Sequence, residues 1–356
     1  MWSLTKLKFS PPTFKRLAIT AAALATITGW SSLRPATAAV VRTDNGMLAQ
    51  KLGIPLYEWQ DDANPEPKLI FLAVHGFTQQ GLCFEALAKE LAARGYLVVA
   101  PDLRGHGRWI GNTGSTNNDF TVSCEDESRL LAQLRKSHPG AKIFGLGESA
   151  GCAVLLKAVC NEPKAVKGLI LCAAGVEPHI HKPGGMGPKF LMGMAKLVEP
   201  VDLTDYYAKY VSDDKRTADE MVHDPLNKSH QSALSLIGTM NFISQMPVLA
   251  SQLPRSIPVL LLQGSDDQIV NASSASRVYD GFKTSDKSLQ EIAGCGHILL
   301  GTSFIKPVVL NDTFDWLEKH GGLPAVIQPQ TSTISSANGP SNSKSFTQKM
   351  KSKFRI

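Results

Sequence analysis

The pentapeptide Gly147-Glu148-Ser149-Ala150-Gly151 contains the residue of this 356-residue chain that is best placed to do chemistry. An apolar run, residues 143–146, precedes it, and an apolar segment of helical length follows it. This order predicts a sharp turn between a strand and a helix, which exposes the hydroxyl of Ser149 as a nucleophile. Glycines suit both ends of the turn, because the strand and the helix pack too closely there for side chains.

A base and an acid are expected after later strands, since a serine hydroxyl attacks only when a base takes its proton and an acid orients that base. His297 follows the apolar run at residues 289–292, in a loop that contains glycine. Asp266 and Asp267 follow the run at residues 258–263, and one of them is expected to be a turn former. The chain order predicts a catalytic set of Ser149, one aspartate and His297.

The oxyanion formed by such an attack needs two preorganised N–H donors. Ala150 directly follows the nucleophile, and its amide is the first candidate. The second donor is expected in the turn after an early strand, where residues 74–77 read Val-His-Gly-Phe, and the amide of Phe77 is predicted to be this donor. His75 is expected to be a structural hydrogen-bonding residue of the same turn.

A dinucleotide site is the competing interpretation, because residues 145–150 also satisfy the G-x-G-x-x-A pattern. That function requires an acid at the end of the next strand, about 20 residues later, to bind a ribose hydroxyl. The next apolar run, residues 166–174, ends without an acid, which disfavours nucleotide binding.

Short apolar runs bounded by Gly, Pro or Asp recur along the chain, and most are unbroken, as in strands buried on both faces. They lie at residues 69–74, 96–100, 143–146, 168–173, 259–262 and 289–292. Helical stretches such as residues 84–93 separate them. This alternation predicts an α/β fold, in which helices cover both faces of a mostly parallel sheet.

The alternation fails at residues 175–254, where amphipathic pieces lie at residues 190–198, 204–211 and 232–249. An insertion after a strand end lies over the carboxyl edge of the sheet, where open α/β sheets bind ligands. The segment is therefore a candidate cap, and an ordinary subdomain with its own small core is the alternative.

Five ordered motifs resemble those of the α/β-hydrolase superfamily, over about residues 68–320. They are His75-Gly76-Phe77, Asp102-Leu103-Arg104-Gly105-His106-Gly107-Arg108, residues 147–151, residues 264–270 and residues 294–297. The chain is most similar to the branch of monoacylglycerol lipases, lysophospholipases and serine aminopeptidases, which carry a helical cap after the sixth strand. It departs from their pattern where Arg108-Trp109-Ile110 replaces a small residue.

The resemblance implies a hydrolase core formed by residues 40–174 and 255–320, with residues 175–254 as the helical cap. It also implies that Asp267 is the acid, because it occupies the aspartate position of the pattern G-x-x-D-x-I-V, and that Asp266 is the spare.

The predicted function is a serine hydrolase that cleaves a small-molecule carboxylic ester or lipid through an acyl-enzyme, without cofactor or metal. Met192 and Leu197 are candidate substrate-binding residues, since they lie in an apolar, methionine-rich cap segment suited to flexible acyl chains, although such a stripe is more often core. His179 and His181 share a face of an extended segment, but no third ligand follows at metal-binding spacing.

Two alternatives remain open at this point. An aminopeptidase of the same fold should hold a carboxylate cluster for the substrate amine, and the candidates are Asp213, Asp214, Asp219 and Glu220. A non-catalytic binding protein on a hydrolase scaffold is the alternative from another class, since a fold does not determine a function.

The two ends of the chain differ from its middle. Residues 1–39 contain five basic side chains, no acid, an apolar run of about 14 residues and then small residues, which predicts an export signal. The run is shorter than the roughly 20 residues that a membrane-spanning helix needs. A retained N-terminal anchor and an organellar transit peptide are the alternatives.

Residues 328–356 are rich in Ser, Thr, Asn, Gln and Pro, and their five charged side chains are all basic. Such a composition predicts a disordered tail, either simply solvated or in peripheral contact with anionic lipid. Residues 40–327 carry 27 of the 37 basic side chains and all 31 acidic ones, a net charge of −4. This balance argues against a nucleic-acid partner, which would require a basic face.

The six cysteines include no C-x-x-C pair and lie mostly in apolar runs, so most are expected to be buried thiols. An oxidised pair, such as Cys83 with Cys124, is left open by the sequence.

Overall fold

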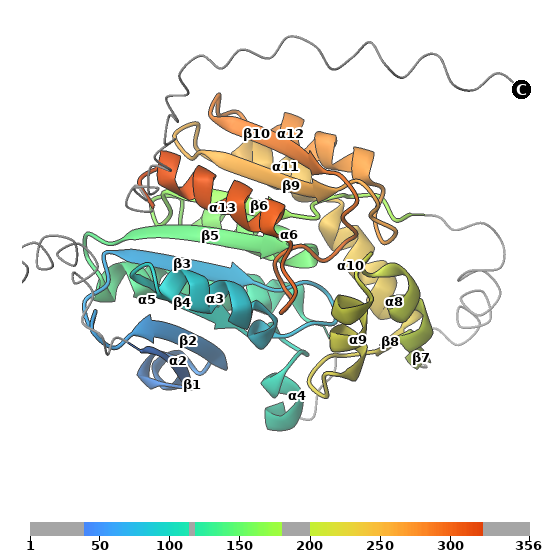
Figure 1. Ribbon diagram of the computed structural model, residues 1–356, viewed down its shortest axis with the longest axis horizontal. Helices are drawn as coiled ribbons and strands as arrows, with labels where there is room; N and C mark the ends of the chain where they lie inside the picture. Colours follow the sequence, from blue (N-terminus) through green and yellow to red (C-terminus); the bar gives the residue numbers. More distant parts are fainter. Residues whose placement is uncertain (1–38, 114–117, 180–199, 323–356) are drawn as a thin grey trace, which may run out of the picture. The chain divides into compact units, whose positions relative to one another are not determined.

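The computed structural model describes residues 39–113, 118–179 and 200–322 (Figure 1). These residues form an eight-stranded sheet in the order β1-β2-β4-β3-β5-β6-β9-β10, in which every neighbouring pair from β4 to β10 is parallel. The strands are β1 (Val40–Asp44), β2 (Leu56–Asp61), β3 (Leu69–Val74), β4 (Tyr96–Pro101), β5 (Lys142–Glu148), β6 (Gly168–Cys172), β9 (Val259–Gly264) and β10 (Lys287–Ile292). The predicted mostly parallel sheet is confirmed.

All six apolar runs singled out in the sequence are strands of this sheet, but β1 and β2 were not predicted. β1 is exposed at four of its five residues and pairs antiparallel with β2, which in turn pairs antiparallel with β4. β1 is at the solvated edge of the sheet, and β2 beside it contains Glu58 and Gln60, so neither strand is the unbroken apolar run of strands buried on both faces. The sequence pattern therefore gave no signal for them.

Helices cover both faces of the sheet, as predicted (Figure 1). Along β3, Ile70 and Leu72 face one hydrophobic core and Phe71 and Ala73 face the other, because successive side chains of a strand alternate. The first core is covered by α2 (Met47–Leu52), α5 (Phe120–Ser137), α6 (Ala150–Asn161), α11 (Met246–Gln252) and α12 (Ala275–Gly281), and the second by α3 (Glu85–Ala92) and α13 (Pro307–Lys319).

The segment predicted as a cap contains helices and one small sheet. Its described elements before α11 are β7 (Pro200–Asp202), α8 (Thr204–Tyr210), α9 (Lys215–His223), β8 (His230–Ser232) and α10 (Ala233–Ile243), with β7 and β8 antiparallel. Leu203, Tyr207 and Met221 form a small hydrophobic cluster there, which Ile298 joins from outside the segment. The predicted amphipathic piece at residues 190–198 lies outside the described residues.

The apolar piece at residues 232–249 is divided between α10 and α11. α11 has Pro247 in its first turn, where the missing N–H of proline is tolerated at a helix start but not in a helix interior. α11 packs against α6 and α12, so the last part of the predicted cap belongs to the helical layer of the sheet. Ala233–Gln252 has the length and mean hydropathy, 1.3, of a candidate membrane span, but it consists of these two packed helices.

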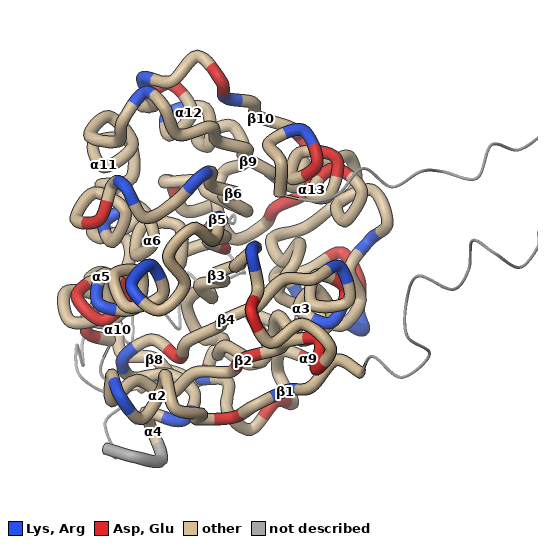
Figure 2. The backbone as a smooth tube through the Cα atoms, turned by 90° about the vertical axis from the view of Figure 1, so that its left-hand side faces the viewer, with Lys and Arg blue, Asp and Glu red and all other residues tan. Residues whose placement is uncertain are grey.

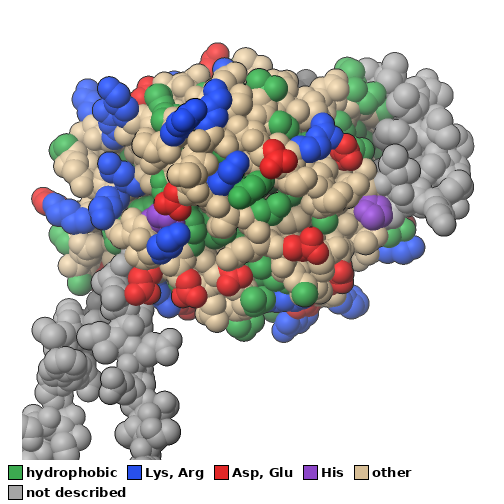
Figure 3. Space-filling model, turned by 90° about the horizontal axis from the view of Figure 1, so that it is seen from above, with side chains coloured by type: hydrophobic (Ala, Val, Ile, Leu, Met, Phe, Trp, Pro, Cys, Tyr) green, Lys and Arg blue, Asp and Glu red, His purple; other side chains and the backbone are tan. Residues whose placement is uncertain are grey.

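Charged residues of both signs are distributed over the helices and connections of the described chain (Figure 2). A view of another face shows acidic, basic and hydrophobic side chains interspersed (Figure 3). The six cysteines are free thiols, and Cys83 and Cys124 are therefore not joined to each other.

Candidate active site

Ser149 lies at the turn between β5 and α6, with φ 56° and ψ −124°. A residue with a side chain rarely adopts this conformation, so the surrounding structure must hold it. The glycines beside it are required by close packing, because a Cβ at Gly147 would lie 2.6 Å from Cys152 Cα and one at Gly151 would lie 2.2 Å from the carbonyl oxygen of Val74. Cys152 is fully buried beneath the turn and donates through Sγ to the Gly147 carbonyl oxygen at 3.1 Å.

The strand order brings the predicted base and acid to this turn. β5, β6, β9 and β10 are consecutive parallel neighbours, so the loops at their carboxyl ends share one edge of the sheet. His297 Nε2 lies 2.8 Å from Ser149 Oγ, and His297 Nδ1 lies 2.8 Å from Asp267 Oδ2. The three side chains therefore form a continuous hydrogen-bonded chain.

The structure also distinguishes the two aspartates. Asp267 is buried, and besides the ring of His297 it accepts the amides of Ile269 and Val270 on Oδ1, at 2.9 and 3.0 Å. Asp266 is exposed and accepts the hydroxyl of Ser265. Asp267, not Asp266, is therefore the aspartate that reaches the histidine.

Gln263 was not singled out by the sequence, yet its Nε2 donates to Asp267 Oδ2 at 2.8 Å. A polar residue near the end of the otherwise apolar strand β9 was the signal that could have identified it. Its amide helps to fix the orientation of the carboxylate.

Burial and charge oppose each other at this pair. Burial disfavours the ionised form of Asp267, but the charge and hydrogen bond of His297 and the two backbone amides outweigh it and hold the pKa of Asp267 below its ordinary value. Burial likewise disfavours the protonated ring of His297, but Asp267, and with it Glu148, raises the pKa of His297 above its ordinary value. A neutral ring beside an ionised aspartate can accept a proton from Ser149, because the aspartate stabilises the protonated ring.

The turn that follows β3 lies directly beside Ser149, since a Cβ at Gly76 would be 3.0 Å from Ser149 Cβ. Within the described residues, the amides of Phe77 and Ala150 donate to no acceptor. Both are therefore available to a ligand next to Ser149. His75 is hydrogen-bonded at both ring nitrogens, because Nδ1 donates to the Gly76 carbonyl oxygen at 2.8 Å and Nε2 accepts the amide of Leu103 at 3.0 Å.

The departure at Arg108-Trp109-Ile110 builds a cluster around the buried Asp102. Arg108 Nε donates to Asp102 Oδ2 at 3.0 Å, and the Arg108 guanidinium lies 3.6 Å from the centre of the Tyr57 ring. Trp109 Nε1 donates to the backbone oxygen of Asp102 at 2.8 Å, and its ring lies under the guanidinium of Arg104. The larger side chains are thus accommodated by stacking and by one shared acceptor residue.

A cavity of about 410 Å³ opens at Ser149 and His297. Its described lining is mainly apolar and aromatic and comes largely from the cap: Leu203, Tyr206, Tyr207, Val211, Met221, Leu236, Ile237 and Met240. No acidic side chain is among its described lining residues. Met192 and Leu197, the predicted substrate-binding residues, lie outside the described residues.

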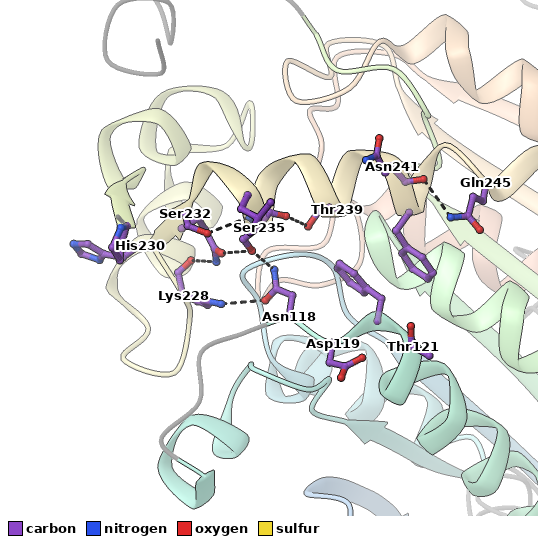
Figure 4. Close-up of a pocket in the computed structure, with 16 residues that line it drawn as sticks. Asn118, Asp119, Thr121, Lys228, His230, Ser232, Ser235, Thr239, Asn241 and Gln245 are labelled. Atoms are coloured by element: carbon purple, nitrogen blue, oxygen red, sulfur yellow. Dashed lines mark hydrogen bonds between the residues drawn. The ribbon is translucent and has the colours of Figure 1, made fainter. Parts of the chain in front are cut away.

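A second cavity, of about 550 Å³, lies between α5 and α10 and contains neither Ser149 nor His297 (Figure 4). Its polar side chains bond to one another: Lys228 Nζ donates to Asn118 Oδ1, Asn118 Nδ2 donates to Ser235 Oγ, and Ser235 Oγ donates to Gln231 Oε1. Gln231 Nε2 completes the ring at the Lys228 carbonyl oxygen. This closed network of hydrogen bonds links the cap to Asn118, just before α5.

The four acids considered for an amine-binding cluster do not lie in the cavity at Ser149. Asp213 bonds to Lys306, Asp214 to Arg216, and Asp219 to Lys215, whereas Glu220 accepts bonds from Thr302 and Ser303. Each is therefore engaged elsewhere. The described residues also contain no group of three potential metal ligands, and His181 lies outside them.

Comparison with known proteins identifies relatives of this chain. The family described as "Serine aminopeptidase, S33" matches residues 65–302. The monoglyceride lipase of Homo sapiens is 26% identical over 238 residues, which cover 65% of this chain and 76% of the lipase. The monoacylglycerol lipase of Mycolicibacterium smegmatis is 23% identical over 266 residues, which cover 74% of this chain and 91% of the relative.

Solved structures share the fold. A thermostable carboxyl esterase from Bacillus coagulans superposes with a TM-score of 0.60 at 18% identity, over 80% of this chain and 99% of the esterase. A soluble variant of monoglyceride lipase from Saccharomyces cerevisiae gives a TM-score of 0.60 at 18% identity, over 81% of this chain and 97% of that chain. The sheet and its helical layers are thus those of known esterases and lipases.

The packing at the Ser149 turn can be tested by substitution. We expect Gly151→Ala to lower the free energy of unfolding by about 1–3 kcal/mol, because the added methyl meets backbone atoms that cannot move aside. Urea unfolding measures the change. Gly238→Ala in α10 is the matched control, since a Cβ there meets nothing within 4 Å and alanine favours a helix. Equal stabilities of the two variants would contradict the packing argument.

Proposed function

We propose that this chain, which belongs to the serine aminopeptidase family of α/β-hydrolases, cleaves lipid-like esters through an acyl-enzyme on Ser149. Its relatives support the coarser statement that it is a carboxylic ester hydrolase. The observation that carries the proposal is the hydrogen-bonded chain from Ser149 Oγ through His297 to Asp267. Its order and its distances match those of a serine nucleophile, a general base and an orienting acid.

Acylation begins when His297 Nε2 takes the proton of the Ser149 hydroxyl while Oγ attacks the ester carbonyl carbon. Asp267 keeps the other ring proton on Nδ1 and stabilises the imidazolium that forms. The amides of Phe77 and Ala150 donate to the oxyanion of the tetrahedral intermediate. His297 then returns the proton to the departing alcohol, and the acyl group remains on Ser149.

Deacylation repeats these steps with water. His297 removes a proton from a water molecule, whose oxygen attacks the acyl carbon, and the same two amides stabilise the second oxyanion. Collapse of this intermediate breaks the bond to Ser149 Oγ, which recovers its proton from His297. The products are one alcohol and one carboxylic acid, and no redox step or cofactor is involved.

The apolar cavity supports a lipid-like acyl group. Its volume of about 410 Å³ lies within the range of small-molecule sites, and its lining offers hydrophobic and aromatic surface close to the nucleophile. Met221 and Met240 add side chains that adapt to flexible chains. The relatives named as monoglyceride lipases are consistent with such a substrate.

The same cavity disfavours an aminopeptidase. A substrate α-amine carries a positive charge, and burying it without a carboxylate partner is costly. The acids proposed as partners lie elsewhere and are bonded elsewhere.

The proposal extends to the location of the protein. We propose that residues 1–39 direct export and that the basic residues of the segment 328–356 contact anionic lipid, supported by the composition of these two segments. N-terminal sequencing of the protein recovered from the periplasm or from the medium should find a start near residue 40. Recovery of the intact chain inside the cell would contradict the proposed export.

The nucleophile can be identified by covalent labelling. We expect a fluorophosphonate to modify Ser149 of the full chain, because its hydroxyl is activated by His297, and mass spectrometry of the labelled peptide locates the site. Ser149→Ala should abolish labelling. Asp267→Asn should slow ester hydrolysis by a factor on the order of 10³–10⁴, because the ring is left in the wrong tautomer.

Ser276→Ala is the matched control, since this serine is exposed on α12 and its hydroxyl bonds to the Ser273 carbonyl oxygen. It should label at the wild-type rate. A panel of p-nitrophenyl esters, monoacylglycerols and aminoacyl-naphthylamides then separates the two enzyme classes, and we expect turnover of the esters alone. A folded, unlabelled wild-type protein would favour a non-catalytic binding protein instead.

The pH dependence follows from the raised pKa of His297. The ring must be neutral to accept the proton of Ser149, so activity is lost as the pH falls through the pKa of this histidine. Because that pKa lies above the ordinary value of 6.5, we expect the acidic limb of kcat/KM to have its midpoint above pH 6.5. Steady-state kinetics on a soluble ester tests this, and a midpoint at or below pH 6.5 would count against the assignment.

A further inference from the structure

Glu148, the last residue of β5, is a fully buried carboxylate that directly precedes Ser149. It accepts three backbone amides from a distant part of the chain. Leu299 N and Leu300 N donate to Oε1 at 2.7 and 2.9 Å, and Gly301 N donates to Oε2 at 2.7 Å. A single side chain beside the nucleophile therefore binds three consecutive amides of the loop that carries His297.

This histidine loop, residues 293–306, connects β10 to α13 and lies outside helices and strands. The three amides before those bound by Glu148 are held by the cap: Gly296 N donates to Asp213 Oδ1 at 2.6 Å, and His297 N and Ile298 N donate to the Val211 carbonyl oxygen at 3.2 and 3.3 Å. All amides from residue 296 to residue 301 are thus satisfied by groups on other elements. Glu148 accepts three of these six amides, and it is directly bonded to Ser149 in the chain.

The loop fits closely around the carboxylate. Gly301 lies so near that a Cβ on it would be 2.4 Å from Glu148 Oε2 and 3.2 Å from Cys83 Sγ. Gln79 Nε2 donates to the Gly301 carbonyl oxygen at 2.9 Å. The position of the loop is therefore coupled to that of Glu148 by both packing and hydrogen bonds.

Glu148 also acts on His297 by charge. Burial raises the pKa of Glu148, whereas its three amide donors and His297 act in the opposite direction and favour the ionised form. The charge of Glu148 adds to that of Asp267 in raising the pKa of His297. The groups that face these two residues from other elements are Asp267 after β9, Asp213 paired with Lys306, the phenols of Tyr206 and Tyr207 on α8, and the thiols of Cys83, Cys152 and Cys172.

On the basis of the proposed acyl-enzyme chemistry, we propose that Glu148 is a second positioning carboxylate of the active site. It binds the histidine loop to the nucleophile turn, which keeps the imidazole of His297 at Ser149, and it stabilises the imidazolium that forms during acylation. Glu148 does not line the cavity at Ser149, so it acts through His297 and not on the substrate.

Glu148→Gln tests the proposal with an isosteric change. The amide group keeps one acceptor oxygen but presents N–H donors toward at least one backbone amide, and the charge is lost. We expect kcat to fall on the order of 10-fold to 100-fold with KM nearly unchanged, since a small displacement of a catalytic group costs rate and the cavity is untouched. The acidic limb of kcat/KM should move to lower pH by about half a unit or more.

Glu220→Gln is the matched control. Glu220 also accepts bonds from the histidine loop, from Ser303 N and Thr302 Oγ1 at 2.9 and 2.8 Å, but it lies on α9 and does not affect the pKa of His297. We expect this variant to lose thermal stability and to keep the wild-type acidic limb. If Glu148→Gln likewise changes only the melting temperature, Glu148 is a structural residue and the proposal is wrong.

Gly301→Ala provides a second route that keeps the charge. Its methyl group pushes on Glu148 Oε2 and Cys83 Sγ, so we expect a lower kcat with an acidic limb closer to that of the wild type than in Glu148→Gln. If Glu148→Gln does not fold, Gly301→Ala tests whether Glu148 positions His297. A folded Gly301→Ala protein with wild-type kcat would overturn that proposal.

The test separates this inference from the proposed function. If the wild type is not labelled at Ser149 and hydrolyses no ester, the proposed function fails. The contact is then tested directly by an NMR titration of His297 in Ser149→Ala, with and without Glu148→Gln, in which an unchanged imidazole pKa overturns the role of Glu148. If the wild type is active and the acidic limb of Glu148→Gln does not move, only the inference about Glu148 fails.

Discussion

The backbone at Ser149 must be held at φ 56° and ψ −124°, and much of the structure meets that requirement. A residue in such a conformation costs on the order of 1–3 kcal/mol and persists only where its surroundings determine it. β5, which precedes Ser149, pairs on both sides with β3 and β6, and α6, which follows, packs against β5. The turn is therefore held between two buried elements, and the Ser149 hydroxyl lies 2.8 Å from His297 Nε2.

The histidine loop lies outside regular secondary structure, so no helix or strand of its own positions the side chain of His297. It is held instead by acceptors on other elements: Glu148 beside Ser149, and Val211 and Asp213 in the cap. Buried backbone amides need hydrogen-bond acceptors, and these three residues supply them to the loop. The cap thereby supports the loop of His297 and also lines the cavity.

Burial also sets the electrostatics of the site. Asp267 and His297 are both almost excluded from water, where a lone charge would be strongly disfavoured, yet together they stabilise each other's charged forms. The apolar cavity extends this low-dielectric environment to Ser149. In the proposed reaction, hydrogen bonds to a developing oxyanion would be stronger in such surroundings than in water.

The fold was largely predictable from the sequence, because strands buried on both faces must be continuous apolar runs, and five such runs form β3 to β6 and β9. β10 was predicted although it lies at the sheet edge and reads Lys-Ser-Leu-Gln-Glu-Ile. β1 and β2 escaped prediction, since β1 is exposed at the sheet edge and its neighbour β2 contains the polar residues Glu58 and Gln60, so neither is a continuous apolar run. The division of residues 232–249 into α10 and α11 also escaped it, because both pieces are apolar and only their packing partners differ.

Local patterns likewise placed Ser149, His297 and the pair Asp266 and Asp267 at strand ends, because a sharp turn and a flexible loop have recognisable residue requirements. Their meeting was decided by the tertiary structure, since the strand order β5-β6-β9-β10 is a property of the assembled sheet. The same holds for the choice of Asp267, which depends on which carboxylate points inward, and for Glu148, whose amide donors lie more than 150 residues away. Sequence alone determines which residue types follow each strand, whereas only the packed chain determines which of them touch, because contacts between distant segments depend on the whole arrangement.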